Sequence, residues 1–379
     1  MSAPTVLLTL GRLPKSLDIA RSFAAAGSRV IVAEPFARHL AGASRSVAKS
    51  VAVTPPSAGK RAYLEDLARV VREEGVELVV PVSEETMHVA FLRALLPAGV
   101  RVFTPEAAQL LPLHDKHGFT RLCAAHGVRA PETHLLGTPD AAALAARQDV
   151  VVKPVHSAGG RGFRLVRRGE ALPAEAAPHV VQAYVAGQVY SSCGIAAKGR
   201  LLGNAIYRGV MFAGSVAIVF ERVTDNPAIE AWIERFVAAS GHTGFISFDM
   251  IQDAAGVVWG IECNPRVTSG VHFLETADIA PAILHGTPAR PRAEARLQQF
   301  YSTLTALTGV MFRRGYTRTL RTLLGTKDVT WSWRDPMPFL TMTWTTWPII
   351  RLAMQRRVPF GEVATLDIGW YEGEEPPSA

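Results

Sequence analysis

The chain has 379 residues, of which 48% are hydrophobic and 19% charged, so we expect a globular protein of two or three domains. Its 40 basic and 33 acidic side chains give a net charge of +7. No nucleic-acid recognition motif accompanies this surplus, so we expect no nucleic-acid partner. A modest basic surplus also suits a protein that binds small anionic molecules.

Cysteine spacing and apolar runs bear on the compartment. The three cysteines, Cys123, Cys193 and Cys263, lie far apart, so neither a disulfide framework nor a zinc site is indicated. The first residues lack the basic start and the long apolar core of a signal peptide. No apolar run approaches the roughly 18 residues of a membrane span. We therefore expect a cytoplasmic protein with no membrane partner.

The first third of the chain alternates apolar runs with helical patterns. We expect strands at residues 5–10, 29–33, 50–53, 78–81 and 100–103, and helices at residues 16–26, 60–74 and 84–96. This alternation predicts a parallel sheet covered on both faces, which we place in a Rossmann-like α/β domain at residues 1–108. Glu34 would suit a ribose hydroxyl, but Gly11 is the one glycine in a turn where a dinucleotide site needs three. We therefore expect no nicotinamide cofactor.

The next segment carries two lysines and a glycine-rich loop. Lys116 begins an expected helix that ends near residue 125, and Lys153 lies near the end of an apolar strand at residues 150–154. The loop at residues 157–162 contains three glycines, whose backbone amides can wrap phosphate oxygens. The alternatives are solvated lysines and a surface hairpin. A further strand at residues 180–185 can act as a hinge whose backbone offers a donor and an acceptor to an adenine edge.

Residues 244–270 hold two apolar runs separated by a turn. We expect strands at residues 246–251 and 257–263. The hairpin would place Asp249 near Glu262 and Asn264, which point the same way because residues i and i+2 share a strand face. Three oxygen ligands would then converge, as Mg²⁺ prefers. The alternative is a solvated hairpin, although the apolar surroundings of Glu262 favour a paired or metal-bound carboxylate.

In this order the motifs resemble the ATP-grasp superfamily. The matching segments are Asp115-Lys116, Val152-Lys153-Pro154, residues 157–162, the hinge from Gln182 to Val185, and Asp249, Glu262, Asn264 and Arg266. The resemblance is to carboxylate–amine ligases that act on amino acids, with a preceding domain similar to that of carbamoyl phosphate synthase. It implies a Rossmann-like domain, then an α+β small (lid) subdomain at residues 109–186, a large subdomain at residues 187–288 and a largely helical extension at residues 289–379.

The resemblance also implies the roles of individual residues. ATP would lie between the two subdomains, with its phosphates held by Lys116, Lys153 and a loop that contains Ser157, Gly159, Gly160 and Gly162. Its adenine would contact Gln182, Tyr184 and Val185. The metal ligands would be Asp249, Glu262 and Asn264, holding one or two Mg²⁺ ions with Mn²⁺ as an alternative. Arg266 and Lys153 would act on the transferred phosphoryl group.

The ribose and substrate contacts follow less directly from the resemblance. The family has an acidic ribose-binding residue seven positions after the first hinge residue, and this position is Val189, so Gln188 or Tyr190 would have to substitute. The candidates for substrate contact are Ser269, Gly270 and His272, which follow the metal motif, and Arg208 and Arg222, which would pair with a carboxylate. For both arginines, a place on the surface is the alternative.

The function implied is an ATP-dependent ligase. It would activate a small carboxylic acid, with an amino acid as the favoured class, as an acyl phosphate that an amine then captures. Two alternatives stay open: an enzyme that activates bicarbonate, and a regulatory protein that binds ATP without turnover. The expected partners are ATP and the small carboxylate and amine substrates, and a homodimer is a further option.

The last ninety residues differ in character from the rest. Residues 297–324 have helical periodicity, residues 331–339 are aromatic with too many prolines for regular structure, and residues 342–354 predict an apolar helix interrupted at Pro348. We expect a helical extension packed on the body or on a second subunit, with membrane-surface binding as the alternative. A loose terminus is expected from residue 373.

Overall fold

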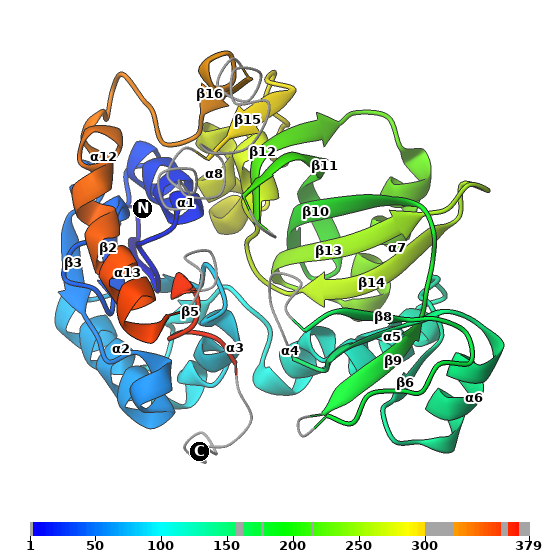
Figure 1. The fold of residues 1–379 in the computed structure, drawn as a ribbon. Helices are drawn as coiled ribbons and strands as arrows, with labels where there is room; N and C mark the ends of the chain where they lie inside the picture. Colours follow the sequence, from blue (N-terminus) through cyan, green and yellow to red (C-terminus); the bar gives the residue numbers. More distant parts are fainter. Residues whose placement is uncertain are drawn as a thin grey trace.

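A computed structural model describes residues 3–156, 162–175, 178–213, 216–299, 322–357 and 363–370, which form three sheets (Figure 1). The predicted combination of α/β and α+β parts is confirmed. Three expected loop residues, Ser157, Gly159 and Gly160, lie outside the described residues, as do most of the helix expected at residues 297–324 and the terminus from residue 373.

The N-terminal sheet is parallel and has the strand order β3-β2-β1-β4-β5, an order found in doubly wound folds. Its strands are β1 (Thr5–Leu8), β2 (Arg29–Glu34), β3 (Lys49–Ala52), β4 (Leu78–Val80) and β5 (Arg101–Val102). Alternate side chains of β1 face opposite layers: Val6 and Leu8 pack with helix α1 (Pro14–Ala25), whereas Leu7 packs with α2 (Lys60–Glu74). Both faces of the sheet are therefore covered, as the alternation of strands and helices predicts.

The helix expected at residues 84–96 is shorter than predicted. The structure has α3 (Thr86–Val89) followed by a 3₁₀ turn at Leu92–Leu95. The late start has a local cause, because the buried Glu85 carboxylate accepts hydrogen bonds from the backbone amides of Val82 and Ser83. These bonds hold the chain in a loop until α3 begins.

The second sheet has seven strands in the order β14-β13-β10-β11-β12-β15-β16. They are β10 (Gln188–Ala197), β11 (Arg200–Ala213), β12 (Val216–Val223), β13 (Gly244–Gln252), β14 (Val258–Asn264), β15 (Arg296–Gln298) and β16 (Lys327–Asp328). One face packs on α5 (Lys116–Ala125) and α7 (Pro227–Ser240), and the other packs on a 3₁₀ turn at Ser269–Phe273, on α8 (Thr276–His285) and on α1. The second face thus joins this sheet to the N-terminal domain.

The third sheet is antiparallel, with the order β6-β9-β7-β8. It contains β6 (Thr133–Leu135), β7 (Val150–Pro154), β8 (Arg164–Val166) and β9 (His179–Ala183), and it packs on α6 (Pro139–Arg147) in a core of its own. The helices that precede it, α4 (Ala107–His114) and α5, contribute Leu113 and Phe119 to the core of the seven-stranded sheet instead. The division into subdomains at residues 109, 187 and 289 stays a prediction.

The C-terminal segment corrects three expectations. Leu297 lies in strand β15, paired with β12, where a helix was expected to begin. Helix α12 (Met337–Leu340) lies within a stretch expected to be irregular. Helix α13 (Met342–Arg356) continues through Pro348, where an interruption was expected. A proline removes only one backbone hydrogen-bond donor, the one that would bond the carbonyl of Trp344, and Trp344 is exposed. Among the described helices, none has the length and apolar character needed to cross a membrane.

Candidate functional site

The polar hairpin has the geometry expected from the sequence. Asp249 on β13 lies directly opposite Glu262 on β14, and Asn264 follows on the same face. The Asn264 side-chain amide donates to Asp249 Oδ2 at 3.1 Å, and Ser191 Oγ of β10 donates to Asp249 Oδ1 at 2.6 Å. Three strands thus bring four oxygen-bearing side chains to one point.

The electrostatics of the hairpin favour a cation. Burial and the negative charge of Glu262 raise the pKa of Asp249 to about 6, because two like charges close together resist simultaneous ionisation. The Asn264 carbonyl oxygen accepts a hydrogen bond from Arg266 and keeps a second lone pair. A divalent ion among these oxygens would relieve the repulsion, so the donor set fits Mg²⁺.

Two buried lysines approach the same strand. Lys153 Nζ of β7 donates to Gln182 Oε1 at 2.9 Å and to the Ile261 carbonyl of β14 at 3.0 Å, so it bridges the small and the large sheet. Burial lowers its pKa to about 8. Lys116 Nζ, at the start of α5, lies 3.7 Å from Glu262 Oε2. Both expected phosphate-binding lysines therefore lie next to the hairpin.

The expected hinge is partly engaged in other contacts. The Gln182 amide donates to Thr133 while its oxygen accepts from Lys153, so this side chain is fixed on both sides. The backbone amide of Tyr184 donates to the Asp149 carbonyl at 3.0 Å, so this group does not face an adenine edge. Val185 is half-buried beside it.

Gly162 is the described residue of the glycine-rich loop. It has a φ of +72°, and a Cβ there would lie 2.8 Å from the ring of Pro154, the last residue of β7. Both the backbone angle and the close approach require glycine at this position. Gly162 therefore lies tightly against Pro154, the residue that follows Lys153 in β7.

The register of β10 places Val189 on the site face. Val189 and Ser191 share one face, and Ser191 contacts Asp249. Gln188 and Tyr190 lie on the opposite face, where Tyr190 packs against the core formed with α5 and α7. Neither residue can therefore take the place of the acidic ribose ligand at position 189.

Arg266 is held in place by both domains. Its guanidinium lies 2.6 Å from Glu84, which follows β4 of the N-terminal sheet, and donates to Asn264 Oδ1 at 2.9 Å. Lys15 of α1 donates to the Val267 carbonyl at 2.7 Å, and burial together with the Arg266 charge lowers the pKa of Lys15 to about 7. The N-terminal domain therefore contributes directly to the environment of Arg266.

Sequence reasoning missed Glu84, Lys15 and His114. His114 ends α4, is stacked on His156 and has an Nδ1 without a hydrogen-bond partner among the described residues. Burial lowers its pKa to about 3. A signal existed for Lys15 and Glu84: each follows the carboxyl end of a predicted parallel strand, where ligands of such sheets bind.

The substrate candidates separate into two groups. Arg208 pairs with Glu221 at the surface on the face opposite Tyr207, so the structure does not bring it to the hairpin. Gly270 packs against Tyr207, whose hydroxyl donates to Thr268, and Ser269 Oγ accepts a hydrogen bond from Gln299. These last contacts lie on the site face.

Arg222 belongs to a cross-strand row on the site face. The paired residues along this row are Glu262, Asp249, Ser191, Tyr207 and Arg222. Directly paired residues share a face, so Arg222 lies on the same side as the carboxylates, three strands or about 14 Å from Asp249. Its Nε is buried without a partner among the described residues.

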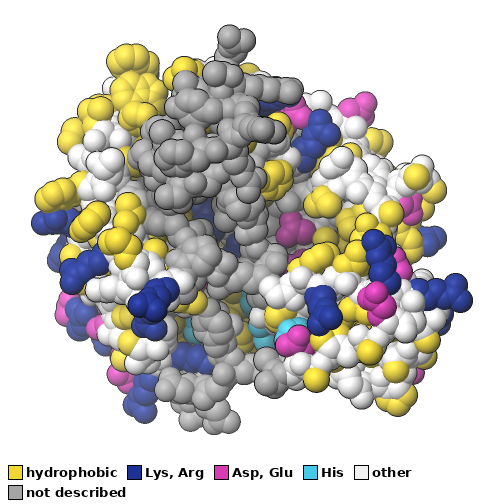
Figure 2. All heavy atoms as spheres, viewed as in Figure 1, with side chains coloured by type: hydrophobic (Ala, Val, Ile, Leu, Met, Phe, Trp, Pro, Cys, Tyr) yellow, Lys and Arg dark blue, Asp and Glu magenta, His cyan; other side chains and the backbone are white. Residues whose placement is uncertain are grey.

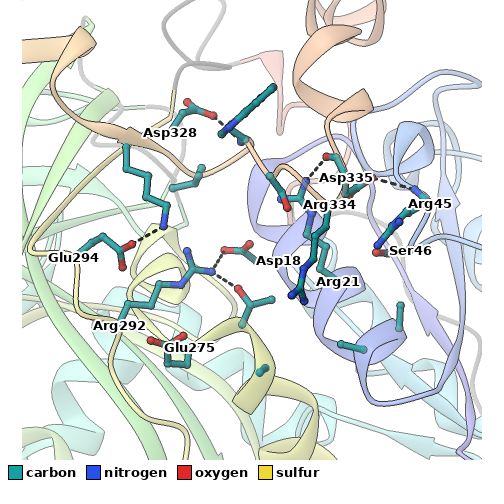
Figure 3. Close-up of a pocket in the computed structure, with 18 of the residues that line it drawn as sticks. Asp18, Arg21, Arg45, Ser46, Glu275, Arg292, Glu294, Asp328, Arg334 and Asp335 are labelled. Carbon is teal, nitrogen blue, oxygen red and sulfur yellow. Dashed lines mark hydrogen bonds and ion pairs between the residues drawn. The ribbon is translucent and has the colours of Figure 1, made fainter.

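His272 is buried against the N-terminal domain. Its Nδ1 lies 2.8 Å from Asp18 Oδ2 of α1, while its Nε2 has no partner among the residues that the structure describes. A cavity of about 980 Å³ adjoins this pair, and Figure 3 shows Arg292 pointing toward Asp18, with a separation of 3.4 Å. The cavity lies between α1, α8 and residues 327–335, away from the hairpin.

Comparisons with known proteins agree with this arrangement. A model of the ATP-grasp domain matches residues 113–270. The C-terminal section of the carbamoyl phosphate synthase large chain from Methanopyrus kandleri is 25% identical over 251 residues, which are 60% of this chain and 46% of that protein. The chain thus spans about half the length of this curated relative.

Solved structures share the fold at low sequence identity. The L-amino acid ligase from Bacillus licheniformis has a TM-score of 0.58 at 18% identity, covering 75% of each chain. The N5-carboxyaminoimidazole synthetase from Staphylococcus aureus, complexed with ADP, has a TM-score of 0.60 at 11% identity, covering 75% of this chain and 78% of that one. The biotin carboxylase domain of the Hydrogenobacter thermophilus 2-oxoglutarate carboxylase, with MgADP, has a TM-score of 0.56 at 17% identity, covering 71% and 65%. Residues 113–270 of this chain therefore match the ATP-grasp domain in sequence, and the chain shares its fold with these structures.

Proposed function

We propose that the chain is an ATP-dependent ligase that activates a small carboxylic acid as an acyl phosphate and couples it to an amine, releasing ADP and phosphate. The observation that carries this proposal is the convergence of Asp249, Glu262 and Asn264 with Lys116 and Lys153 at one hairpin. Phosphoryl transfer requires little covalent chemistry from the protein and depends on positioning and charge neutralisation. Paired carboxylates beside two buried lysines suit that task.

The residues divide into two proposed roles around ATP. Asp249, Glu262 and Asn264 would hold one or two Mg²⁺ ions, and Mn²⁺ also accepts such oxygen ligands. Bound there, the metal would neutralise phosphate charge. Lys116 and Lys153 would contact the phosphates directly. Lys153 is already oriented by Gln182 and Ile261, so little side-chain entropy is lost when a phosphate binds.

Arg266 is the residue we assign to charge that develops during transfer. Glu84 and Asn264 fix its guanidinium before any ligand arrives. A donor that is already oriented costs no reorganisation at the moment of reaction. Burial of Arg266 and of Lys15 also limits the access of water, which would hydrolyse an acyl phosphate.

The favoured acid is an amino acid, and Arg222 would contact one end of the substrate. Arg222, whose Nε has no partner within the described part of the chain, lies at the far end of the cross-strand row that begins at Glu262. A guanidinium in that place suits a carboxylate remote from the reacting carbon. The fold shared with an L-amino acid ligase supports the same substrate class.

The curated relative favours a second candidate. It is part of a carbamoyl phosphate synthase, and a biotin carboxylase domain shares the fold, so bicarbonate is the alternative acid. The amide-forming and the bicarbonate-activating enzyme would use the same hairpin and lysines. They differ in the acid that supports ADP formation.

One experiment distinguishes the amide-forming ligase from the bicarbonate-activating enzyme. The protein is incubated with ATP, Mg²⁺, hydroxylamine and pools of carboxylic acids, and ADP and hydroxamates are measured by coupled assay and mass spectrometry. A hydroxamate that disappears in Glu262→Gln supports the ligase and identifies the acid. ADP that depends on bicarbonate, without hydroxamate, supports the alternative. ATP binding with no ADP from any pool, amino acids and bicarbonate included, contradicts both and favours a regulatory ATP-binding protein.

A further inference from the structure

A group of large apolar side chains on the C-terminal extension is exposed. Six of them, which we call the tryptophan face, are between 50% and 86% exposed: Trp333, Met337, Leu340, Trp344, Trp347 and Met354. They come from the segment before α12, from α12 and from α13, which lie in front of the N-terminal sheet in Figure 1. Figure 2 shows hydrophobic side chains gathered there, with basic side chains among them. Exposed clusters of this size mark interaction surfaces.

Helix α13 has one buried side and one exposed apolar side. Its inner residues, Met342, Thr345, Thr346 and Ile349, are buried, and Ile349 packs in a cluster with Leu40 and Val363. Its exposed residues Trp344, Trp347 and Met354 recur at helical spacing along the opposite face. The inner face already anchors the helix to the body. Among the described residues, the outer face carries exposed apolar side chains that a partner could contact.

The exposed charges within residues 331–357 have one sign. Residues 331–357 contain four arginines, all exposed: Arg334, Arg351, Arg356 and Arg357. The same stretch has one acidic residue, Asp335, which is buried and bonded to Arg21 at 2.9 Å. From the adjacent domain, the Arg38 guanidinium stacks over the Trp344 ring at 4.4 Å. The partner should therefore be apolar and anionic.

We propose that the tryptophan face binds an anionic membrane surface, with α13 lying in the plane of the interface. Tryptophan and arginine are favoured at the boundary between headgroups and acyl chains. Each arginine near an anionic bilayer adds about 1 kcal/mol of attraction. A second copy of the chain fits less well, because a symmetric contact would bring the four arginines of each copy into one interface.

The test uses the full chain and vesicles of two compositions. We expect co-sedimentation with phosphatidylcholine vesicles that contain about 30% phosphatidylglycerol, much weaker binding to phosphatidylcholine alone, and release at about 0.5 M NaCl. Tryptophan fluorescence should shift to shorter wavelength on binding. Trp344→Ser/Trp347→Ser and Arg351→Glu/Arg356→Glu should each weaken binding at least about tenfold.

Leu135→Ser, an exposed leucine on β6 remote from α13, is the matched control and should bind like the unmodified chain. Thermal unfolding of each variant checks that the fold is retained. Failure to bind the anionic vesicles would overturn the proposal, as would equal binding by the double tryptophan variant. A concentration-dependent dimer that this same variant abolishes, without vesicle binding, would assign the tryptophan face to a second copy instead.

Discussion

Asp249 and Glu262 face each other across β13 and β14, and the nearest cation to Glu262 among the described ion pairs is Lys116, at 3.7 Å. Lys153 and Arg266 are further cations near the pair, and both oppose the rise in the pKa of Asp249. The pKa of Asp249 is nonetheless raised, since burial and the Glu262 charge both favour its protonated form. Burial and the Glu262 charge therefore outweigh the nearby cations, and a bound cation would favour the ionised form of Asp249.

Glu262→Gln should abolish the metal-dependent step while sparing the fold. Because the substitution removes the like charge opposite Asp249, we expect unchanged or slightly higher thermal stability without ligand. Mg²⁺-dependent ADP formation should fall about 10²–10³-fold, the scale for losing one group that stabilises transition-state charge. The measurement pairs ADP release with thermal unfolding with and without MgATP. A variant that retains both turnover and the MgATP-induced stabilisation would remove Glu262 from the site.

Lys153→Met should weaken ATP binding more than it slows turnover. The change removes a charged donor and leaves Gln182 Oε1 and the Ile261 carbonyl without it. Loss of one charge-assisted hydrogen bond costs about 1.5–3 kcal/mol, or about 10–150-fold in affinity. Isothermal titration with ATP measures this loss directly. Gln182→Met is the matched variant, because it leaves the ammonium in place and should weaken ATP binding less.

Arg222→Gln tests the proposed substrate contact, with Arg208→Gln as its control. Both arginines lie near one another on β12 and β11, but Arg222 shares the face of Asp249 whereas Arg208 pairs with Glu221 on the other face. We expect Arg222→Gln to raise the KM for the acid or the amine at least about tenfold with a smaller effect on kcat. Arg208→Gln should leave both constants unchanged. Equal effects from the two variants would contradict the assignment.

Acid should destabilise the protein through its buried histidines. Burial lowers the pKa of His242 to about 4, whereas an unfolded chain titrates near 6.5. Between these values the unfolded state binds more protons, so the free energy of unfolding falls as pH drops. For His242 alone the loss from pH 7 to pH 5 is about 2 kcal/mol.

His242→Gln should reduce this pH dependence. Glutamine can still donate to the Phe245 carbonyl, which accepts from His242 Nε2 at 3.1 Å, and it does not titrate. Urea unfolding at pH 5, 6, 7 and 8 gives the comparison, and the values at pH 8 serve as the internal reference. If the variant and the unmodified chain lose the same free energy between pH 7 and pH 5, His242 is not the origin.

Local features were predictable from the sequence, and non-local ones were not. Asp249, Glu262 and Asn264 lie on two strands joined by a short turn, so alternation alone fixes their common face. Glu84 follows a predicted parallel strand, which marks it as a candidate, but no local pattern encodes its contact with Arg266 of another domain. The same holds for Lys15, whose burial depends on how α1 meets the segment after β14.

Secondary structure shows the same difference between local and non-local signals. Helix α2 matches its predicted bounds, because its apolar spacing and terminal glycine are local signals. Residues 297 and 298 lie at the start of the predicted helical stretch, yet they belong to β15, because pairing with β12 outweighs local propensity. Strand β6 of the third sheet was missed because three residues carry too little periodicity.

Arg12 shows how such distant contacts hold the extension to the N-terminal domain. Its guanidinium is fully buried, donates from Nε to Glu34 at 2.8 Å and from Nη1 to Asp367 at 2.7 Å. Burial opposes the charge, but the two carboxylates outweigh it and raise the pKa of Arg12. Glu34 also accepts from the Gly11 amide, so its carboxylate is committed to the protein and does not serve a ribose.

Arg12→Met should therefore destabilise the protein by about 3–5 kcal/mol, because Glu34 is left as an uncompensated buried charge. Arg61→Met removes an exposed arginine of α2 and should change stability by less than about 0.5 kcal/mol. Adding Glu34→Gln to Arg12→Met should recover part of the loss, since the buried charge is then gone. Urea unfolding of the unmodified chain and of these three variants measures the free energy of unfolding of each. If Arg12→Met is as stable as Arg61→Met, the Arg12 pair does not secure the extension.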